Sequence, residues 1–264
     1  MKGFVVAILF IGSVLFGDVY YAKLEPFESY TIKSDVAGKV IYSDLSKESK
    51  YVTNALIIKI DDNTDRDDLK VSVKKLESLK ELVKLKIQNI KNLKRAYIIR
   101  KRNYDRIKNL KTKSNFEKDT QLLSVIAANS SLIAANESLI NLKNQIKDIS
   151  HKIFVLKDRI SKKNITIKKR YIYKISVKKG DYVAPGAILM QTMDISKAKA
   201  TIYLSYEDRE NLDKKSIFIN GKKSDIKFYK VWDVADTTNI SSYKAEIVLP
   251  RPKEFSKVIK IELK

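Results

Sequence analysis

Residues 111–117 read Lys111-Thr112-Lys113-Ser114-Asn115-Phe116-Glu117 and interrupt a stretch, residues 65–163, that holds neither proline nor glycine. A stretch of roughly a hundred residues without a strong breaker predicts helix. Ser114 and Glu117 have the S-x-x-E spacing of a capping box, which marks the start of a new helix. We therefore predict two antiparallel helices joined by a tight turn. The alternative is one continuous helix that pairs with a second copy of the chain.

Apolar residues recur every seven positions on both sides of this interruption. The first half has one such row from Leu69 to Tyr104; Val73 with Ile87 adds a second row, and Leu79, Leu93 and Ile107 widen the stripe. The second half has one row from Val125 to Ile160 and another, three residues later, from Ala128 to Leu156. This a/d spacing predicts a coiled coil. Each arm of about 45 residues would extend about 65–70 Å at 1.5 Å per residue.

The residues before and after the helical stretch are typical of β-strands. Before it, residues 18–62 hold several β-rich runs, with Pro26 as an interruption. After it, residues 167–195 alternate polar and apolar side chains between glycine-containing turns. We expect these two segments to come together as one compact β domain from which the helical hairpin projects. We also expect flexible joints between the hairpin and this domain, near residues 62–65 and 164–168.

The last part of the chain, residues 198–264, consists of short predicted strands separated by turns. Asn220-Gly221 is the strongest hairpin signal among them. Short strands with frequent turns predict a small β-barrel domain. The predicted fold class is therefore α+β: a long antiparallel coiled-coil hairpin inserted into a β domain, followed by a small barrel.

The first 17 residues are typical of an export signal. Met1-Lys2 is a short positive region, Phe4–Phe16 is an apolar run, and Gly17 is a small residue at its end. The run is short for a membrane span of about 20 residues. We predict a secretory signal peptide in residues 1–17; the alternative is an uncleaved inner-membrane anchor.

Composition excludes several classes of function. The chain has no cysteine and a single histidine, His151, which rules out thiolate metal sites, cysteine nucleophiles and histidine clusters. Its formal net charge is +22, from 53 basic and 31 acidic residues. Sixteen basic and three acidic residues lie between Leu69 and Lys113. Because the chain is predicted to be exported, nucleic acid is not an expected partner; compositional bias and a functional basic surface remain alternatives.

Residues 180–189 fit the half-motif G-D-x-V-x-x-G-x-x-L of biotinyl/lipoyl-like domains, with Gly180, Asp181, Val183 and Gly186 at its turn positions. Gly38 precedes the strand of the other half. Two such halves around a coiled-coil hairpin, behind an export signal, resemble the membrane-fusion protein (HlyD-like) family, periplasmic adaptors of tripartite efflux systems. The opening of residues 21–40 is most similar to adaptors of resistance-nodulation-division (RND) pumps.

The resemblance implies a non-enzymatic adaptor in the periplasm, associated with the inner membrane. It implies an inner-membrane transporter and an outer-membrane channel protein as partners, and a homo-oligomeric ring, by resemblance a hexamer. An ABC or type I secretion partner is the alternative to an RND pump. Two rival functions are an envelope coiled-coil scaffold that binds anionic polymer or lipid, and an exported biotin- or lipoate-carrying subunit. No cofactor is expected, since Met190-Gln191-Thr192-Met193 has no lysine between its methionines.

The hairpin turn is the candidate site. Family members that dock on a channel use an arginine, a leucine and a serine near this turn, and here Arg106, Leu110 and Ser114 occur in that order. An arginine can donate bidentate hydrogen bonds to a channel helix, and a leucine can fill an apolar groove. The alternative is an exposed basic residue, a core leucine and a helix cap without a docking role.

Overall fold

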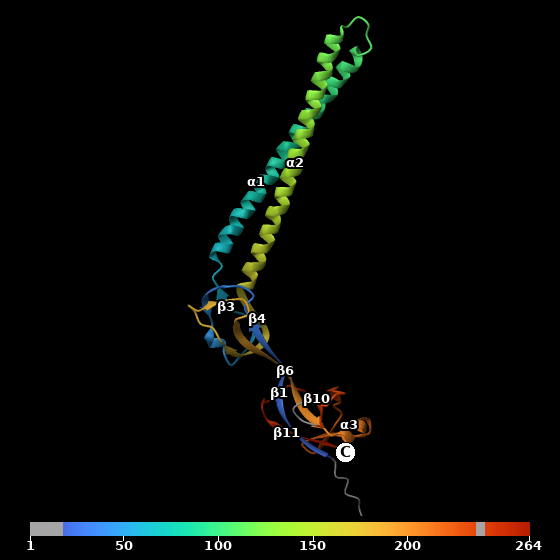
Figure 1. Cartoon of the computed structure of the whole chain (residues 1–264). Coiled ribbons are helices and arrows are strands. Elements are labelled where there is room, and N and C mark those ends of the chain that lie inside the picture. The colour runs from blue at the N-terminus through green and yellow to red at the C-terminus, as the bar shows by residue number, and fades with distance from the viewer. Residues whose placement is uncertain (1–17, 236–240) are drawn as a thin grey trace, which may run out of the picture.

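The computed structural model of the chain describes residues 18–235 and 241–264, so the predicted signal peptide at 1–17 lies outside the described residues. A helical hairpin, a central β domain and a terminal β domain follow one another along one long axis (Figure 1). The elements in chain order are β1 Asp18–Lys33, β2 Gly38–Ser43, η1 Leu45–Lys47, β3 Lys50–Ile60, α1 Asn63–Ile107, α2 Asn115–Lys162, β4 Asn164–Ile175, β5 Tyr182–Val183, β6 Ile188–Leu204, α3 Tyr206–Glu210, η2 Leu212–Lys214, β7 Ile217–Ile219, β8 Lys222–Ser224, β9 Phe228–Val231, β10 Tyr243–Pro250 and β11 Val258–Leu263.

The helical stretch forms two antiparallel helices, α1 and α2, which confirms the predicted hairpin. The capping box at the start of α2 is also confirmed, because Ser114 and Glu117 exchange side-chain and backbone hydrogen bonds. Along the seam, Leu79 of α1 is buried against Ile149 and Ile153 of α2. Small residues of α2, Ala128 and Ala135, are buried in the half of the hairpin nearer the turn.

The second apolar row predicted on α1 is wrong. Val73 and Ile87 are more than a third exposed, whereas Leu79, which was predicted to widen the stripe, is buried in one row with Ser72. The physical reason is helix geometry. The residue three positions after each member of the Leu69–Tyr104 row faces α2, even where that residue is polar.

The central β domain contains strands from both sides of the hairpin in the order β5-β2-β3-β4-β6-β1. Gly38 of β2 pairs with Val183 of β5, and the Gly180 N–H donates to the Val40 carbonyl at 2.8 Å. Val40, Ile58 and Leu189 are fully buried in the core that these strands share. The two segments around the hairpin therefore fold as one body, as expected.

The terminal β domain has the strand order β8-β7-β11-β1-β6-β10-β9. Ala198, Ile247 and Ile261, from three of these strands, are fully buried in its core. Asn220 and Gly221 connect β7 to β8 with φ of 49° and 80°, which are the left-handed values of the predicted hairpin turn. The domain buries a core of its own, separate from that of the central domain.

Two long strands, β1 and β6, run through both β domains and pair with each other from Leu24 to Lys33 of β1 and from Ile188 to Ala200 of β6. Pro26 was predicted to interrupt the first of these strands, and this prediction is wrong. Pro26 pairs with Ala198 next to a register shift between Pro26 and Glu28, a β-bulge at which a missing N–H is tolerated. The two domains are thus joined by a two-stranded ribbon.

The joints between hairpin and central domain are held by ion pairs, contrary to the flexible joints expected from the sequence. Asp62, at the start of α1, is fully buried and contacts Arg66 at 2.7 Å and Lys59 at 3.4 Å. Asp65 is also buried and pairs with Arg159 and Lys163 at the end of α2. β4 begins at Asn164, directly after α2 and three residues before the predicted start of the second β segment.

Candidate functional site

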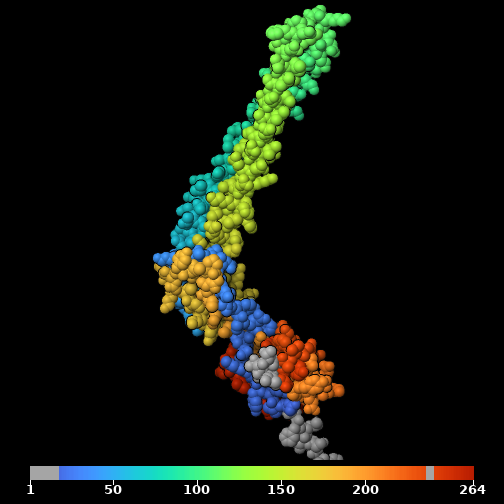
Figure 2. Space-filling model, in the orientation of Figure 1, coloured from blue at the N-terminus to red at the C-terminus, as the bar shows by residue number. Residues whose placement is uncertain are grey.

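The turn of the hairpin lies at the far end of a narrow rod that projects from the central domain (Figure 2). α1 ends at Ile107 and α2 begins at Asn115, so residues 108–114 make the connection. The Lys108 N–H still donates to the Tyr104 carbonyl at 2.9 Å, and the Leu110 N–H donates to Ile107 at 3.0 Å. The last turn of α1 therefore continues into the loop.

Ser114 is the N-cap of α2. Its hydroxyl accepts from the Glu117 N–H at 3.2 Å, and the Ser114 N–H donates to Glu117 Oε2 at 3.1 Å. The Lys113 ammonium contacts Glu117 Oε1 at 3.1 Å, and this ion pair together with the Ser114 backbone lowers the pKa of the Glu117 carboxyl. The side chains of Ser114 and Glu117 are both engaged in the helix cap. Ser114 therefore has a structural role at the position predicted for docking.

The other two predicted docking residues flank the same loop. Arg106 is exposed in the last turn of α1, and Leu110 lies in the loop with 44% of its surface exposed. Leu110 is therefore not a core leucine. The structure places all three residues, Arg106, Leu110 and Ser114, at the tip of the rod, and their docking role stays a prediction.

Sequence reasoning missed Phe116. This side chain, in the first turn of α2, is 80% exposed at the tip. It lines a groove of about 360 Å³ with Asn103, Ile107 and Thr120, among other residues. A phenylalanine directly inside a capping box, with no apolar neighbour in the S-N-F-E run, was the signal available in the sequence. Exposed aromatic side chains of this kind are common anchors in protein interfaces.

The tip and the upper part of α1 are strongly basic. The two exposed acidic residues that lie nearest to the tip, Asp105 and Glu117, are each paired with a lysine, Lys108 at 2.9 Å and Lys113 at 3.1 Å. The Lys108 contact lowers the pKa of the Asp105 carboxyl. The tip therefore carries an excess of positive charge, which favours an acidic binding partner.

The turn positions of the predicted half-motif are brought together in the central domain. Gly180 and Gly186 have φ of 105° and 88°, which glycine adopts without strain. The Asp181 carboxylate accepts from the Lys178 N–H at 2.8 Å and closes the first turn. The Gly186 N–H donates to the Ser34 carbonyl at 2.7 Å, and Val183 is buried. These residues hold the domain together.

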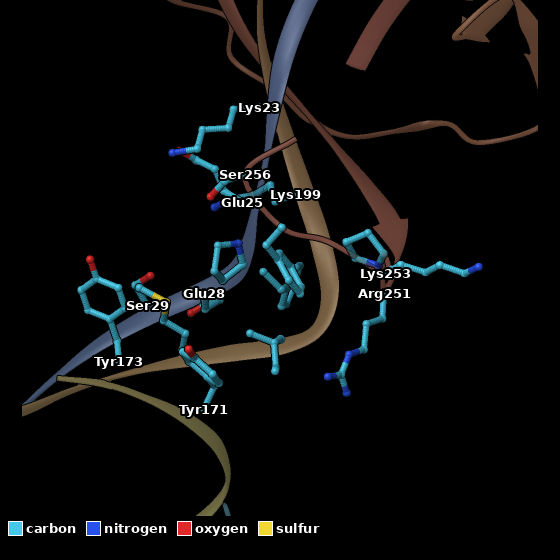
Figure 3. A pocket seen from close by; sticks show the side chains of 16 residues that line it. Lys23, Glu25, Glu28, Ser29, Tyr171, Tyr173, Lys199, Arg251, Lys253 and Ser256 are labelled. Carbon is cyan, nitrogen blue, oxygen red and sulfur yellow. The ribbon is translucent and has the colours of Figure 1, made fainter. Parts of the chain in front are cut away.

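A hollow of about 690 Å³ lies where the two β domains meet (Figure 3). Tyr171 and Tyr173 of β4 line it from the central domain, and Arg251 and Lys253 line it from the segment between β10 and β11. Phe27 of β1 also lines it, and the ring of Phe27 packs edge-on against Tyr229. The hollow leaves the ribbon of β1 and β6 uncovered on one side.

At the end of the terminal domain furthest from the hairpin, a fully buried carboxylate, Asp208, ties the start of β1 to α3. The Tyr20 hydroxyl donates to Asp208, the Lys215 ammonium pairs with it, and its own N–H donates to Ser205 Oγ at 3.1 Å. Burial and the Asp208 contact raise the pKa of Tyr20 to about 12. The first described residues of the chain are thereby fixed to the domain.

Other candidate chemistry has little support among the residues that the structure describes. No group of three or more potential metal-ligating side chains occurs there. His151 is exposed on α2. Met190 and Thr192 are buried within β6, away from any hairpin tip at which a carrier domain would present a lysine. By length and composition alone, α2 is apolar enough to cross a membrane, although it pairs with α1 throughout.

Comparison with known proteins supports the fold. No protein-family model matches the sequence, and neither does any curated protein. Solved structures share this chain's arrangement: a helical hairpin inserted into a β domain that is built from both flanking segments, with a second β domain behind it.

Among solved structures, MacA from Actinobacillus actinomycetemcomitans is similar to 94% of this chain, over 78% of its own length, with a TM-score of 0.63 and 20% identity. A MacA-MexA chimera that contains the Pseudomonas aeruginosa MexA α-hairpin domain is similar over 94% of this chain and 81% of its own, with a TM-score of 0.53 and 16% identity.

Proposed function

We propose that this protein is a periplasmic adaptor of the membrane-fusion family that links an inner-membrane transporter to an outer-membrane channel. The observation that carries the proposal is the insertion of a stiff hairpin, held at its root by buried ion pairs, into a β domain closed by both flanking segments. This arrangement holds an exposed tip about 65–70 Å from the domain that carries it. Spanning a gap in this way needs assembly surfaces and no catalytic residue.

In this proposal the two β domains are a biotinyl/lipoyl-like domain and a small β-barrel, both without a cofactor. The chain enters the periplasm behind residues 1–17 and stays associated with the inner membrane. Copies of it form a ring, by family resemblance a hexamer, through which the transported molecule passes. Energy for transport comes from the transporter, for which we propose an RND pump; an ABC-type or type I secretion transporter is the alternative.

The rival function, a scaffold made of two parallel copies, has less support. α1 folds back on α2 of the same chain, so the heptad seam is already filled without a second copy. The basic surface of α1 remains available for an anionic polymer or lipid, and the experiment below separates the two functions.

The experiment replaces Leu110 by a photo-crosslinking amino acid in the full chain, in cells of the source organism. Illumination is expected to link the tip to an outer-membrane channel protein, identified by mass spectrometry of the linked peptide. The inner-membrane transporter that co-purifies with the chain, RND or ABC, identifies the other partner. Products that contain only cell-wall polymer, lipid or further copies of this chain would reject the adaptor.

The role of Arg106 is tested in the same cells. Arg106→Asp is expected to lower the yield of the channel crosslink by tenfold or more, because the arginine loses its hydrogen bonds and a repulsive charge replaces it. Arg95→Asp makes the same change in net charge three turns below the tip and is the matched control. Equal losses for both variants would show that overall charge, rather than Arg106, governs docking.

A further inference from the structure

The basic residues of α1 occupy only part of its surface. With Leu69 at heptad position a, the charged residues gather at positions b, e and f. Positions c and g, from residue 71 to residue 103, hold one charged residue, Lys75. Three large apolar side chains, fourteen residues apart, lie at position c of this flank, which carries few charges. We call them the outer row of α1: Val71, Leu85 and Ile99.

α2 has a row of the same kind. With Val125 at position a, position b holds Ile126, Ile140 and Phe154, which we call the outer row of α2. At the same heptad position, Ile133 lies between the first two and Lys147 lies between the last two. The six side chains of the two outer rows are between 48% and 68% exposed, although each row repeats at two heptads, every fourteen residues, along one line of its helix. Ordered apolar rows that face solvent usually mark an interaction surface.

The two outer rows lie on opposite sides of the hairpin. In an antiparallel pair of helices, positions c and g of both helices share one side and positions b and e share the other. The structure agrees with this geometry: Lys75, at g of α1, lines a hollow together with Gln145 and Lys152, both at g of α2. The row of α1, at c, is therefore on one side of the rod, and the row of α2, at b, is on the other.

The two outer rows are also level with each other. The Arg100 guanidinium donates to the Ser124 carbonyl at 3.3 Å, and the Arg159 guanidinium donates to Asp65 at 3.2 Å. These two contacts fix which residues of α1 and α2 lie at the same height. Counted from them, the level pairs are, to within one residue, Val71 with Phe154, Leu85 with Ile140, and Ile99 with Ile126.

We propose that the two outer rows form one seam between copies, in which the outer row of α1 packs on the outer row of α2 of the next copy at equal height. Two apolar rows on opposite sides of one rod cannot pack against each other within one chain, and a two-fold dimer cannot bring both rows of each copy into contact. In a head-to-tail series, one row of each copy packs on the other row of the next copy. Such a series closes into a ring when the rotation from one copy to the next allows it. The seam rests on the ring in the proposed function and adds its residues and register.

The absence of cysteine from the sequence makes this register directly testable. A full chain carrying both Leu85→Cys and Ile140→Cys is oxidised in intact cells. We expect a ladder of disulfide-linked copies that ends at the size of the ring. The two positions face opposite sides of one rod, so a bond between them within one chain is geometrically excluded. Leu85→Cys alone is expected to give at least tenfold less linked product.

The matched control is a chain with Leu85→Cys and Ile126→Cys. It has the same number of thiols on the same two rows, but the second position is displaced by fourteen residues, about 21 Å along the helix. The seam is overturned if this pair links as well as the level pair. It is also overturned if neither pair links while mass photometry still finds a ring, in which case the proposed ring stands and only the seam fails. Monomers in both measurements would reject seam and ring together, whereas the crosslink from Leu110 tests docking independently.

Discussion

The strongest prediction concerns Asp62, the buried carboxylate at the root of the hairpin. It accepts from Arg66 Nε at 2.8 Å and from Asn164 at 3.2 Å, and it contacts the Lys59 ammonium at 3.4 Å. Burial by itself raises the pKa of this carboxyl, but the hydrogen bonds from Arg66, Asn164 and Lys59 outweigh burial and lower the pKa to about 2. The carboxylate is thus more stable in the folded protein than in the unfolded chain.

The expected cost of Asp62→Asn follows from this pKa. A decrease from 3.8 to about 2 corresponds to about 2 kcal/mol of folding free energy at neutral pH. Because the folded-state pKa is lower than the unfolded one, this stabilisation is complete above about pH 4 and is lost as the pH falls through the folded value. At pH 3 about half of it remains. The difference between wild type and variant should therefore shrink on acidification.

The assay is urea unfolding of the chain without residues 1–17, followed by helical circular dichroism at pH 7 and pH 3. Asp158→Asn is the control, since Asp158 forms an exposed pair with Lys162 at 2.7 Å, and solvent screens such a pair so that it contributes little to stability. If Asp62→Asn lowers the free energy of unfolding at pH 7 by no more than Asp158→Asn does, the reasoning is refuted. A difference that does not shrink at pH 3 would show that the carboxylate acts by packing rather than by charge.

Three further changes test the fold. Gly38→Ala would place a Cβ 2.6 Å from Ile60 Cγ2, so we expect a loss of about 1–3 kcal/mol and a lower Tm, and an unchanged Tm would contradict the packing described. Leu79→Ala removes a buried seam residue and should cost about 2–4 kcal/mol, visible as faster amide exchange in the lower half of α1; exchange limited to the substituted turn would argue against a cooperative seam. Ser114→Ala should cost about 0.5–2 kcal/mol and speed exchange of the Glu117 amide, while the rest of α2 keeps its protection; slow exchange at that amide would mean that the cap is dispensable.

The parts of the fold that were predictable depend on local rules. A capping box needs only four consecutive residues, and Ser114 with Glu117 located the turn of the hairpin to within one residue. The two heptad rows of α2 were predictable because every residue at position a, from Val125 to Ile160, and at position d, from Ala128 to Leu156, is apolar. The second row of α1 was not, because polar Ser72 and Lys86 occupy seam positions while apolar Val73 and Ile87 face solvent.

The features that escaped prediction depend on contacts between distant residues. Residues 62–65 were expected to be a flexible joint, but Asp62 is buried and accepts a hydrogen bond from Asn164, which lies about a hundred positions away in the chain. β1 continues through Pro26 because β6 supplies pairing on both sides of a bulge. At the tip, the positions of Arg106 and Leu110 followed from the turn, but the exposure of Phe116 depends on how the two helix ends meet.

The unbroken passage of β1 and β6 through both β domains has a mechanical consequence. Separate bodies joined by a loose tether move independently, whereas two paired strands transmit bending and twisting from one body to the next. The ion pairs around Asp62 and Asp65 then couple the central domain to the hairpin. The chain acts as a lever: a tilt of 5° at the root would sweep the far end of a 45-residue helix sideways by about 6 Å.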